Sequence, residues 1–164
     1  MEHNVKIREK IWESVSSLTD EHLNTVVEEG TWSIAQILEH LYLLEESVAK
    51  QIAKTLVSED VNVPEAFPVH LVADRKQKVD APHYVLPSNE HQTLAELKHK
   101  LTTSRETLMH SIEGVSDDDL TEKGFAHRRF GTLALKQWVA LIGYHEERHL
   151  GQIEEVKQAL AKKV

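Results

Sequence analysis

The prolines of this chain all fall in one segment, about residues 57–92, at Pro64, Pro68, Pro82 and Pro87. Proline has no N–H and its ring clashes with the preceding helical turn, so this density rules out a long helix there. Short strand-like pieces, such as residues 82–86, are compatible with it. A connection this long lets the helices on either side run parallel in a bundle. The segment is therefore interpreted as a solvated crossover or as a lid over a site.

Elsewhere the apolar residues recur with the period of an α-helix. Four long helical segments are expected: one over about residues 2–17, and others that begin near residues 33, 93 and 132. Ser33 and Gln36 have the spacing of a capping box, and Gly114 is typical of a helix end. The acidic run that follows Ser116 is typical of a helix start or a turn. The chain is therefore expected to be all-α and, at 164 residues, a single domain over residues 1–164.

Composition excludes several classes of function. The net charge of -8 argues against a nucleic-acid-binding surface and against binding to an anionic membrane. No apolar stretch approaches the roughly 20 residues of a membrane span, and no signal peptide is evident. The chain has no cysteine, which excludes disulfides, a catalytic thiol and thiolate metal ligands. These features favour a cytoplasmic protein that acts on a small molecule.

Histidines on the expected last helix are the most informative candidates for a site. His145 and His149 are four residues apart, so they share one side of the helix with apolar residues such as Ile142 and Ile153. Two buried imidazoles are costly unless each finds a partner, and a metal ion could satisfy both. A pair of core histidines hydrogen-bonded to other helices is the alternative. A metal site needs a third ligand, for which His40, at the edge of the apolar stripe of the second segment, is the candidate.

The remaining histidines carry less information. His127 lies in the expected loop before the last helix and could be near a site. The other seven are expected to be solvated: His3, His22, His70, His83, His91, His99 and His110.

Residues 145–149 also satisfy the pattern H-E-x-x-H of zincin proteases. Those enzymes take a third ligand downstream, and here only Glu154 and Glu155 follow, within the same helix. The protease interpretation is therefore weak. Glu146 is expected to be a solvent-exposed carboxylate on the helix surface, and a role as general base has no support from the spacing alone.

Three segments of the chain resemble one protein family. Residues 32–41 have a tryptophan, a capping serine and then His40, eight residues after Trp32. His127 is followed by the run Phe-Gly-Thr-Leu at residues 130–133 and then by Trp138, and residues 144–153 contain the histidine pair. This order is similar to that of the DinB-like (YfiT-like) metalloproteins, a family related to the bacillithiol transferases.

The resemblance implies a four-helix bundle in an up-down-down-up arrangement, with a long crossover between helices 2 and 3. It implies a divalent metal, usually zinc or nickel, bound by His40, His145 and His149. Family members include transferases that use a low-molecular-weight thiol, others are labelled metal-dependent hydrolases, and many are homodimers. One departure is that Arg128 follows His127, where the family usually has a proline.

The expected function is thus a metal-dependent enzyme, with thiol S-transfer of the bacillithiol type as the first interpretation. Three neutral histidines leave a coordination position on the metal for a substrate. Because the chain has no cysteine, the sulfur nucleophile would come from a thiol in solution. A metal-dependent hydrolase is one alternative, and a non-catalytic metal-binding or partner-binding bundle is another. Gln152, three residues after His149, is expected either to hydrogen-bond a ligand or to lie at the bundle edge.

Overall fold

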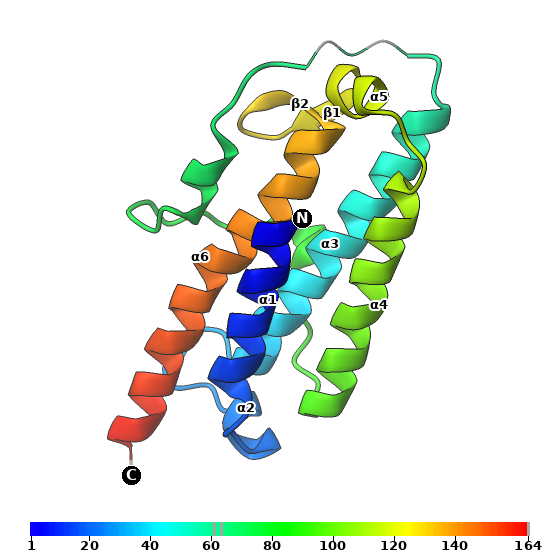
Figure 1. The fold of residues 1–164 in the computed structure, drawn as a ribbon. Coiled ribbons are helices and arrows are strands. Elements are labelled where there is room, and N and C mark those ends of the chain that lie inside the picture. Colours follow the sequence, from blue (N-terminus) through cyan, green and yellow to red (C-terminus); the bar gives the residue numbers. More distant parts are fainter. Residues whose placement is uncertain (61, 63, 164) are drawn as a thin grey trace.

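Four long helices form a bundle in the computed structural model, which describes residues 1–60, 62 and 64–163 (Figure 1). They are α1 (Glu2–Val15), α3 (Ile34–Val57), α4 (Leu94–Ile112) and α6 (Leu135–Lys162). Helices α3 and α4 run parallel to each other and opposite to α1 and α6 (Figure 1). The all-α, up-down-down-up bundle is therefore confirmed, and the long connection between α3 and α4 is the crossover that this arrangement requires.

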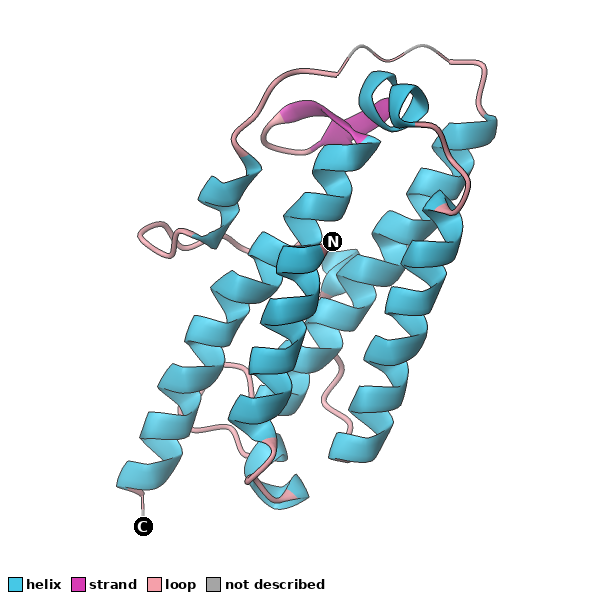
Figure 2. Ribbon diagram, in the orientation of Figure 1, coloured by secondary structure: helices cyan, strands magenta, loops and turns pink. Residues whose placement is uncertain are grey.

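Smaller elements close the two ends of the bundle (Figure 2). Helix α2 (Asp20–Asn24) lies at one end, between α1 and α3. At the other end lie α5 (Asp117–Glu122) and an antiparallel hairpin of β1 (Gly124–His127) and β2 (Gly131–Ala134). The crossover contains two 3₁₀ turns, η1 (Val69–Ala73) and η2 (His83–Val85). Among the described residues, no helix combines the length and the apolar character that crossing a membrane requires.

The helix starts follow the capping pattern of the sequence. Ser33 and Gln36 form the expected capping box at α3, and Thr93 with Glu96 forms another at α4. The hydroxyl of Ser116 accepts the N–H of Asp119 and caps α5. These hydrogen bonds satisfy main-chain donors that the first helical turn leaves without partners, which is why the starts are readable from sequence.

Two expectations about local structure are wrong. The last helix begins at Leu135 and not near residue 132, because residues 131–134 pair with β1 as a strand. The expected strand-like piece at residues 82–86 is instead the 3₁₀ turn η2, in which the N–H of Val85 donates to the carbonyl of Pro82 at 3.1 Å. Residues 83–85 pack against α3. The main-chain groups of α3 are already hydrogen-bonded within the helix, so they cannot pair with residues 83–85 as a neighbouring strand would.

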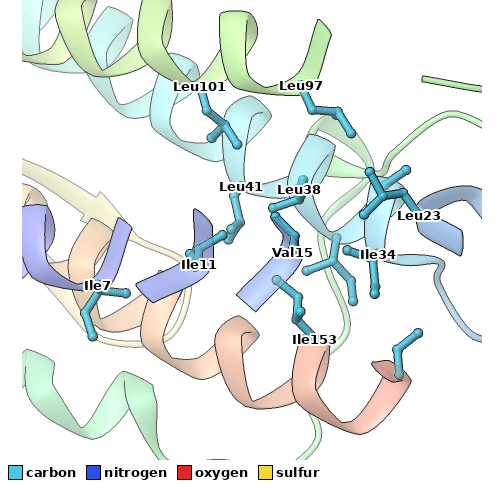
Figure 3. Close-up of a cluster of buried hydrophobic side chains, with 13 residues drawn as sticks. Ile7, Ile11, Val15, Leu23, Ile34, Leu38, Leu41, Leu97, Leu101 and Ile153 are labelled. Carbon is cyan, nitrogen blue, oxygen red and sulfur yellow. The ribbon is translucent and has the colours of Figure 1, made fainter. Parts of the chain in front are cut away.

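The apolar core consists of two clusters stacked along the bundle. One joins α1, α2, α3, α4 and α6, and Figure 3 shows its side chains meeting between the helices, among them Ile11, Leu38 and Ile153. The other lies under the hairpin and includes Leu133 and Ile142. Buried polar residues of α3 and α6 lie in sequence between the members of these clusters: Glu39, His40, Glu45 and Glu146. The polar residues that could do chemistry are thus concentrated at mid-height of the bundle.

Candidate metal centre

Three histidines from two helices meet at mid-height. His40 projects from α3 and is 3% exposed, while His145 and His149 lie one turn apart on α6 and are partly exposed. The Nε2 atom of His145 lies 3.1 Å from Nε2 of His40 and 3.2 Å from Nε2 of His149. The structure thus brings together the three residues that the sequence singles out. Their role as metal ligands stays a prediction.

The spacing of these nitrogens fits a metal ion. Nitrogen ligands at about 2.0–2.1 Å from a tetrahedral zinc ion lie about 3.3 Å from one another. The observed separations of 3.1 and 3.2 Å are close to this value. With its proton on Nε2, His145 would donate a hydrogen bond to one of the other two rings; with its proton on Nδ1, three lone pairs face one another, and a cation between them would remove their repulsion. The donor set therefore suits a divalent metal that accepts imidazole ligands, such as zinc or nickel.

Hydrogen bonds through Nδ1, the ring nitrogen that faces away from the common point, orient two of the three imidazole rings. Nδ1 of His40 lies 2.8 Å from the main-chain oxygen of Val85, and Nδ1 of His149 lies 2.7 Å from Oε1 of Gln152. An oxygen only accepts, so Nδ1 carries the proton in both rings and each Nε2 presents its lone pair to the common point. Gln152 therefore occupies the supporting position expected from its spacing. The carbonyl of Val85 is a partner that sequence reasoning missed, because a main-chain acceptor leaves no signal in the side chains.

The environment keeps the three imidazoles neutral. Burial lowers the pKa of His40, and burial together with the neighbouring histidines lowers the pKa of His145 well below its ordinary value. Burial and the proximity of His40 lower the pKa of His149 to about 3. A protonated imidazole has no lone pair for a metal, so these shifts keep the ligand atoms available at neutral pH.

The expectation that Glu146 is solvent-exposed is wrong. Glu146 is 2% exposed, and its two oxygens accept hydrogen bonds from Nε of Arg8 at 2.5 Å and from Nη2 of Arg105 at 2.9 Å. The same two arginines bind Glu45 of α3, at 3.0 and 2.6 Å. Arg8, Glu45, Arg105 and Glu146 thus form a closed ring of two positive and two negative groups, called here the buried ring, which links all four long helices.

The buried ring explains why Glu146 is buried although exposure was expected, and it argues against Glu146 as a general base. A helical wheel places charged residues outside by default, but Arg8 of α1 and Arg105 of α4 supply the counter-charges that make burial of Glu146 tolerable. Burial raises the pKa of Glu146, and both arginine charges act in the opposite direction. Both carboxylate oxygens are engaged in the ring, so Glu146 does not serve the histidine centre as the general base of a zincin does.

Hydrogen bonds connect the crossover to α3 and to α6, the two helices that carry the three histidines. On α3, Oε2 of Glu39 accepts the N–H of Ser88 at 2.8 Å, next to the contact between His40 and Val85. On α6, the guanidinium of Arg148 donates to the main-chain oxygens of Asp74 and, at 2.6 Å, Gln77. The crossover is therefore more than a solvated connection, because it supplies a partner to one of the three histidines.

The other histidines divide as follows. Those expected to be solvated are exposed, except His3, whose ring packs 4.5 Å from the ring of Tyr144. His127 lies at the end of β1, stacks on Phe130 at 4.3 Å, and has its pKa lowered to about 4 by burial and by the charges of Arg128 and Arg129. The ring of His127 also lies 5.3 Å from the ring of Trp138, at the start of α6.

Comparison with known proteins agrees with this geometry. The family model of the DinB superfamily matches residues 4–153. The protein YuaE of Bacillus subtilis is 29% identical over 93% of this chain and 94% of its own length. Two proteins of Oceanobacillus iheyensis named "putative metal-dependent hydrolase" are each 24% identical, over 88% and 85% of this chain and 76% and 73% of their own lengths. The crystal structure of TT2238, a four-helix bundle protein, superimposes with a TM-score of 0.63 at 18% identity, over 94% of both chains.

Proposed function

The chain belongs to the DinB superfamily, and we propose that it is a metal-dependent enzyme whose divalent ion, zinc or nickel, is bound by His40, His145 and His149. The observation that carries the proposal is the convergence of three Nε2 atoms, within 3.1–3.2 Å of that of His145, with two of the rings fixed through Nδ1. Three protein ligands are typical of catalytic zinc sites, which leave a position for a substrate. The names of the two Oceanobacillus relatives support dependence on a metal.

The proposed reaction is transfer of a low-molecular-weight thiol, of the bacillithiol kind, to a small electrophile. A divalent ion held by neutral ligands lowers the pKa of a thiol or a water molecule that binds beside it. The thiolate sulfur then forms a bond to the electrophilic carbon, the leaving group departs with its electron pair, and the thiol proton passes to solvent. The chain contains no cysteine, so the sulfur comes from a separate molecule. Such thiols stay reduced in the cytoplasm, where we place the protein.

The buried ring favours a thiol over water as the nucleophile. A thiol bound to a divalent ion would be deprotonated outright, whereas a bound water, with a pKa of about 7, would in enzymes of the H-E-x-x-H type also use a general base. Hydrolases with the motif H-E-x-x-H use its glutamate as general base. Here both oxygens of Glu146 are bound by Arg8 and Arg105. Hydrolysis stays the second candidate because two relatives carry that name.

The variant His149→Ala tests the proposal. We expect it to lose the metal and to lose turnover of a low-molecular-weight thiol with a generic electrophile, because one of three ligands is gone. The two apolar clusters do not include His149, so the variant should remain folded. His99→Ala is the matched control, since His99 is an exposed histidine of α4. Metal content, thermal melting and turnover are measured on all three proteins.

Other outcomes would contradict the proposal. A wild type that holds metal yet turns over neither a thiol substrate nor a hydrolysable ester would indicate a non-catalytic metal-binding bundle. A His149→Ala variant that no longer folds would indicate a structural metal, because the binding free energy of such a metal is folding free energy.

A further inference from the structure

Trp32 lies directly before α3, and the main chain is held on both sides of it. On one side, the N–H of Thr31 donates to the main-chain oxygen of Glu28 at 3.1 Å. On the other side, Ser33 and Gln36 form the capping box, with hydrogen bonds of 2.9 and 3.2 Å. The side chain is partly buried and packs against the apolar cluster that joins α1, α2, α3, α4 and α6. The position of the indole is therefore fixed by the turn, the cap and this cluster together.

The indole of Trp32 packs beside two of the three histidines. Its ring centroid lies 4.9 Å from that of His40, with 49° between the ring planes, and 6.5 Å from that of His149, with 24° between the planes. Both separations fall in the range of about 4.5–7 Å in which aromatic side chains interact favourably. The rings of His40 and His149 are themselves 4.7 Å apart. One aromatic side chain thus neighbours a candidate ligand of α3 and a candidate ligand of α6.

The hydrogen bonds at Nδ1 do not by themselves fix the planes of the imidazole rings. The contact of His40 with Val85 and that of His149 with Gln152 each hold one edge of a ring. A ring held at one edge can still tilt about that contact, and tilting turns its Nε2 away from the common point. An aromatic ring packed beside the imidazole limits this motion, because aromatic pairs have preferred arrangements. Trp32 is placed to do this for both rings.

The chemistry of indole adds a second effect at the same place. An imidazole that binds a divalent ion through Nε2 takes on part of the positive charge of the ion. Indole is the aromatic side chain that attracts positive charge most strongly, within about 6 Å of its ring centre. The ring of His40 lies inside this distance. Trp32 should therefore stabilise the cation-bound form of His40 more than the free form, which an aliphatic side chain of similar size would not do.

We infer that Trp32 is a positioning residue of the histidine centre. Its indole keeps the rings of His40 and His149 in the orientation in which both Nε2 atoms face the common point, and through these rings it strengthens the binding of a divalent ion. The inference rests on the proposed function for the presence of a metal, but the positioning of the two rings is measurable in the metal-free protein.

The first test is the zinc affinity of the full chain, measured by competition with a chelator of known affinity. Trp32→Leu should bind zinc about tenfold more weakly, because leucine fills apolar space but has no aromatic ring. Trp32→Phe keeps an aromatic ring and should stay within about threefold of the wild type. Equal losses in Trp32→Leu and Trp32→Phe would show that only the bulk of the indole matters and would refute the inference.

Trp12→Leu is the matched control. Trp12 of α1 is also a partly buried tryptophan that packs against the same apolar cluster, and among the described residues no aromatic pair joins it to a histidine. The two leucine variants should lose similar amounts of thermal stability, but Trp12→Leu should keep the zinc affinity of the wild type. A loss of zinc affinity of the same size in both variants would assign the effect to general destabilisation, against the inference.

The second test is NMR of the metal-free wild type, which depends neither on a variant that folds nor on a metal. Nuclear Overhauser contacts are expected between the indole protons of Trp32 and the carbon-bound ring protons of His40, and the rings of His40 and His149 should each give one set of signals. In Trp32→Leu these signals should broaden or divide, because the rings then sample more than one orientation.

The inference is overturned if the wild type lacks the contacts between Trp32 and His40, or if the imidazole signals of Trp32→Leu are as sharp and as single as those of the wild type. A wild type that shows the contacts but binds no zinc would refute the proposed function, and with it the effect on metal affinity, while the positioning of the rings would be supported. The two failures are therefore distinguishable.

Discussion

Replacing Glu146 with alanine should destabilise the protein far more than its place on a charged stretch of helix suggests. The carboxylate is 2% exposed and accepts two charge-assisted hydrogen bonds, from Arg8 at 2.5 Å and from Arg105 at 2.9 Å. The two arginine side chains are 10% and 15% exposed, so they cannot recover full hydration in the variant. Removing one partner of a buried ion pair costs about 3–5 kcal/mol, which is also the sum expected for two such hydrogen bonds.

The assay is urea and thermal denaturation of the metal-free protein, so that metal binding does not contribute. For a chain of this size, the expected loss corresponds to a fall in Tm of roughly 6–20 °C. Glu147→Ala is the matched control, because Glu147 is the next residue, its side chain is 41% exposed, and its contact is a 3.6 Å approach to His3. That variant should lose less than about 1 kcal/mol.

A double substitution shows whether the loss comes from the ring itself. With Glu146 already replaced, Arg105→Ala should cost much less than it does in the wild type, because its partner is gone. The reasoning is refuted if Glu146→Ala is as stable as Glu147→Ala, or if the two ring substitutions simply add.

Two further measurements test the surroundings of the histidines. Gln152→Ala should lower the metal affinity about 10–100-fold, because it removes the acceptor of His149 Nδ1, and a change below about twofold in a zinc titration would refute this role. In the metal-free protein, burial holds the pKa of His145 well below its ordinary value and that of His149 at about 3, so below about pH 6.5 the unfolded chain takes up protons that the folded chain does not. Stability should therefore fall as the pH drops from 6.5 towards 3, by up to about 1.4 kcal/mol per pH unit for His149, and the lowered pKa of His145 adds a contribution of the same sign. Thermal melts at a series of pH values check this, and a slope that is the same in His149→Gln would contradict it.

The four long helices were predictable because their determinants are local, whereas their up-down-down-up arrangement was implied by the family resemblance. Helical periodicity, the capping pair at Ser33 and Gln36, and the proline-rich crossover are all visible within short windows of sequence. The errors arose where a local preference depends on a distant partner. Residues 131–134 become a strand only because β1 lies alongside, and residues 83–85 form a 3₁₀ turn because α3 offers no free main-chain partners.

The histidine centre was predictable for a related reason. The spacing of His145 and His149 places both on one side of α6, and the segment between Trp32 and His40 has the pattern of the family. The hydrogen-bond partners of the two histidine Nδ1 atoms differ in whether the sequence could predict them. Gln152 is on the same helix as His149 and could be proposed from spacing, whereas the carbonyl of Val85 comes from the crossover and has no side-chain signal.

The buried ring is the feature that no periodicity could reveal, because its members come from four helices and each contact joins residues far apart in sequence. It nevertheless bears directly on the site. Glu146 follows His145 on α6, and Glu45 lies little more than one turn after His40 on α3. Since Arg8 and Arg105 each bind both carboxylates, the ring fixes how far α3 is displaced along α6. A shift of one turn, about 5.4 Å, would separate His40 from His145 and His149. The polar ring thus sets the helix register that the three histidines require, a role that an apolar contact of similar volume would specify less strictly.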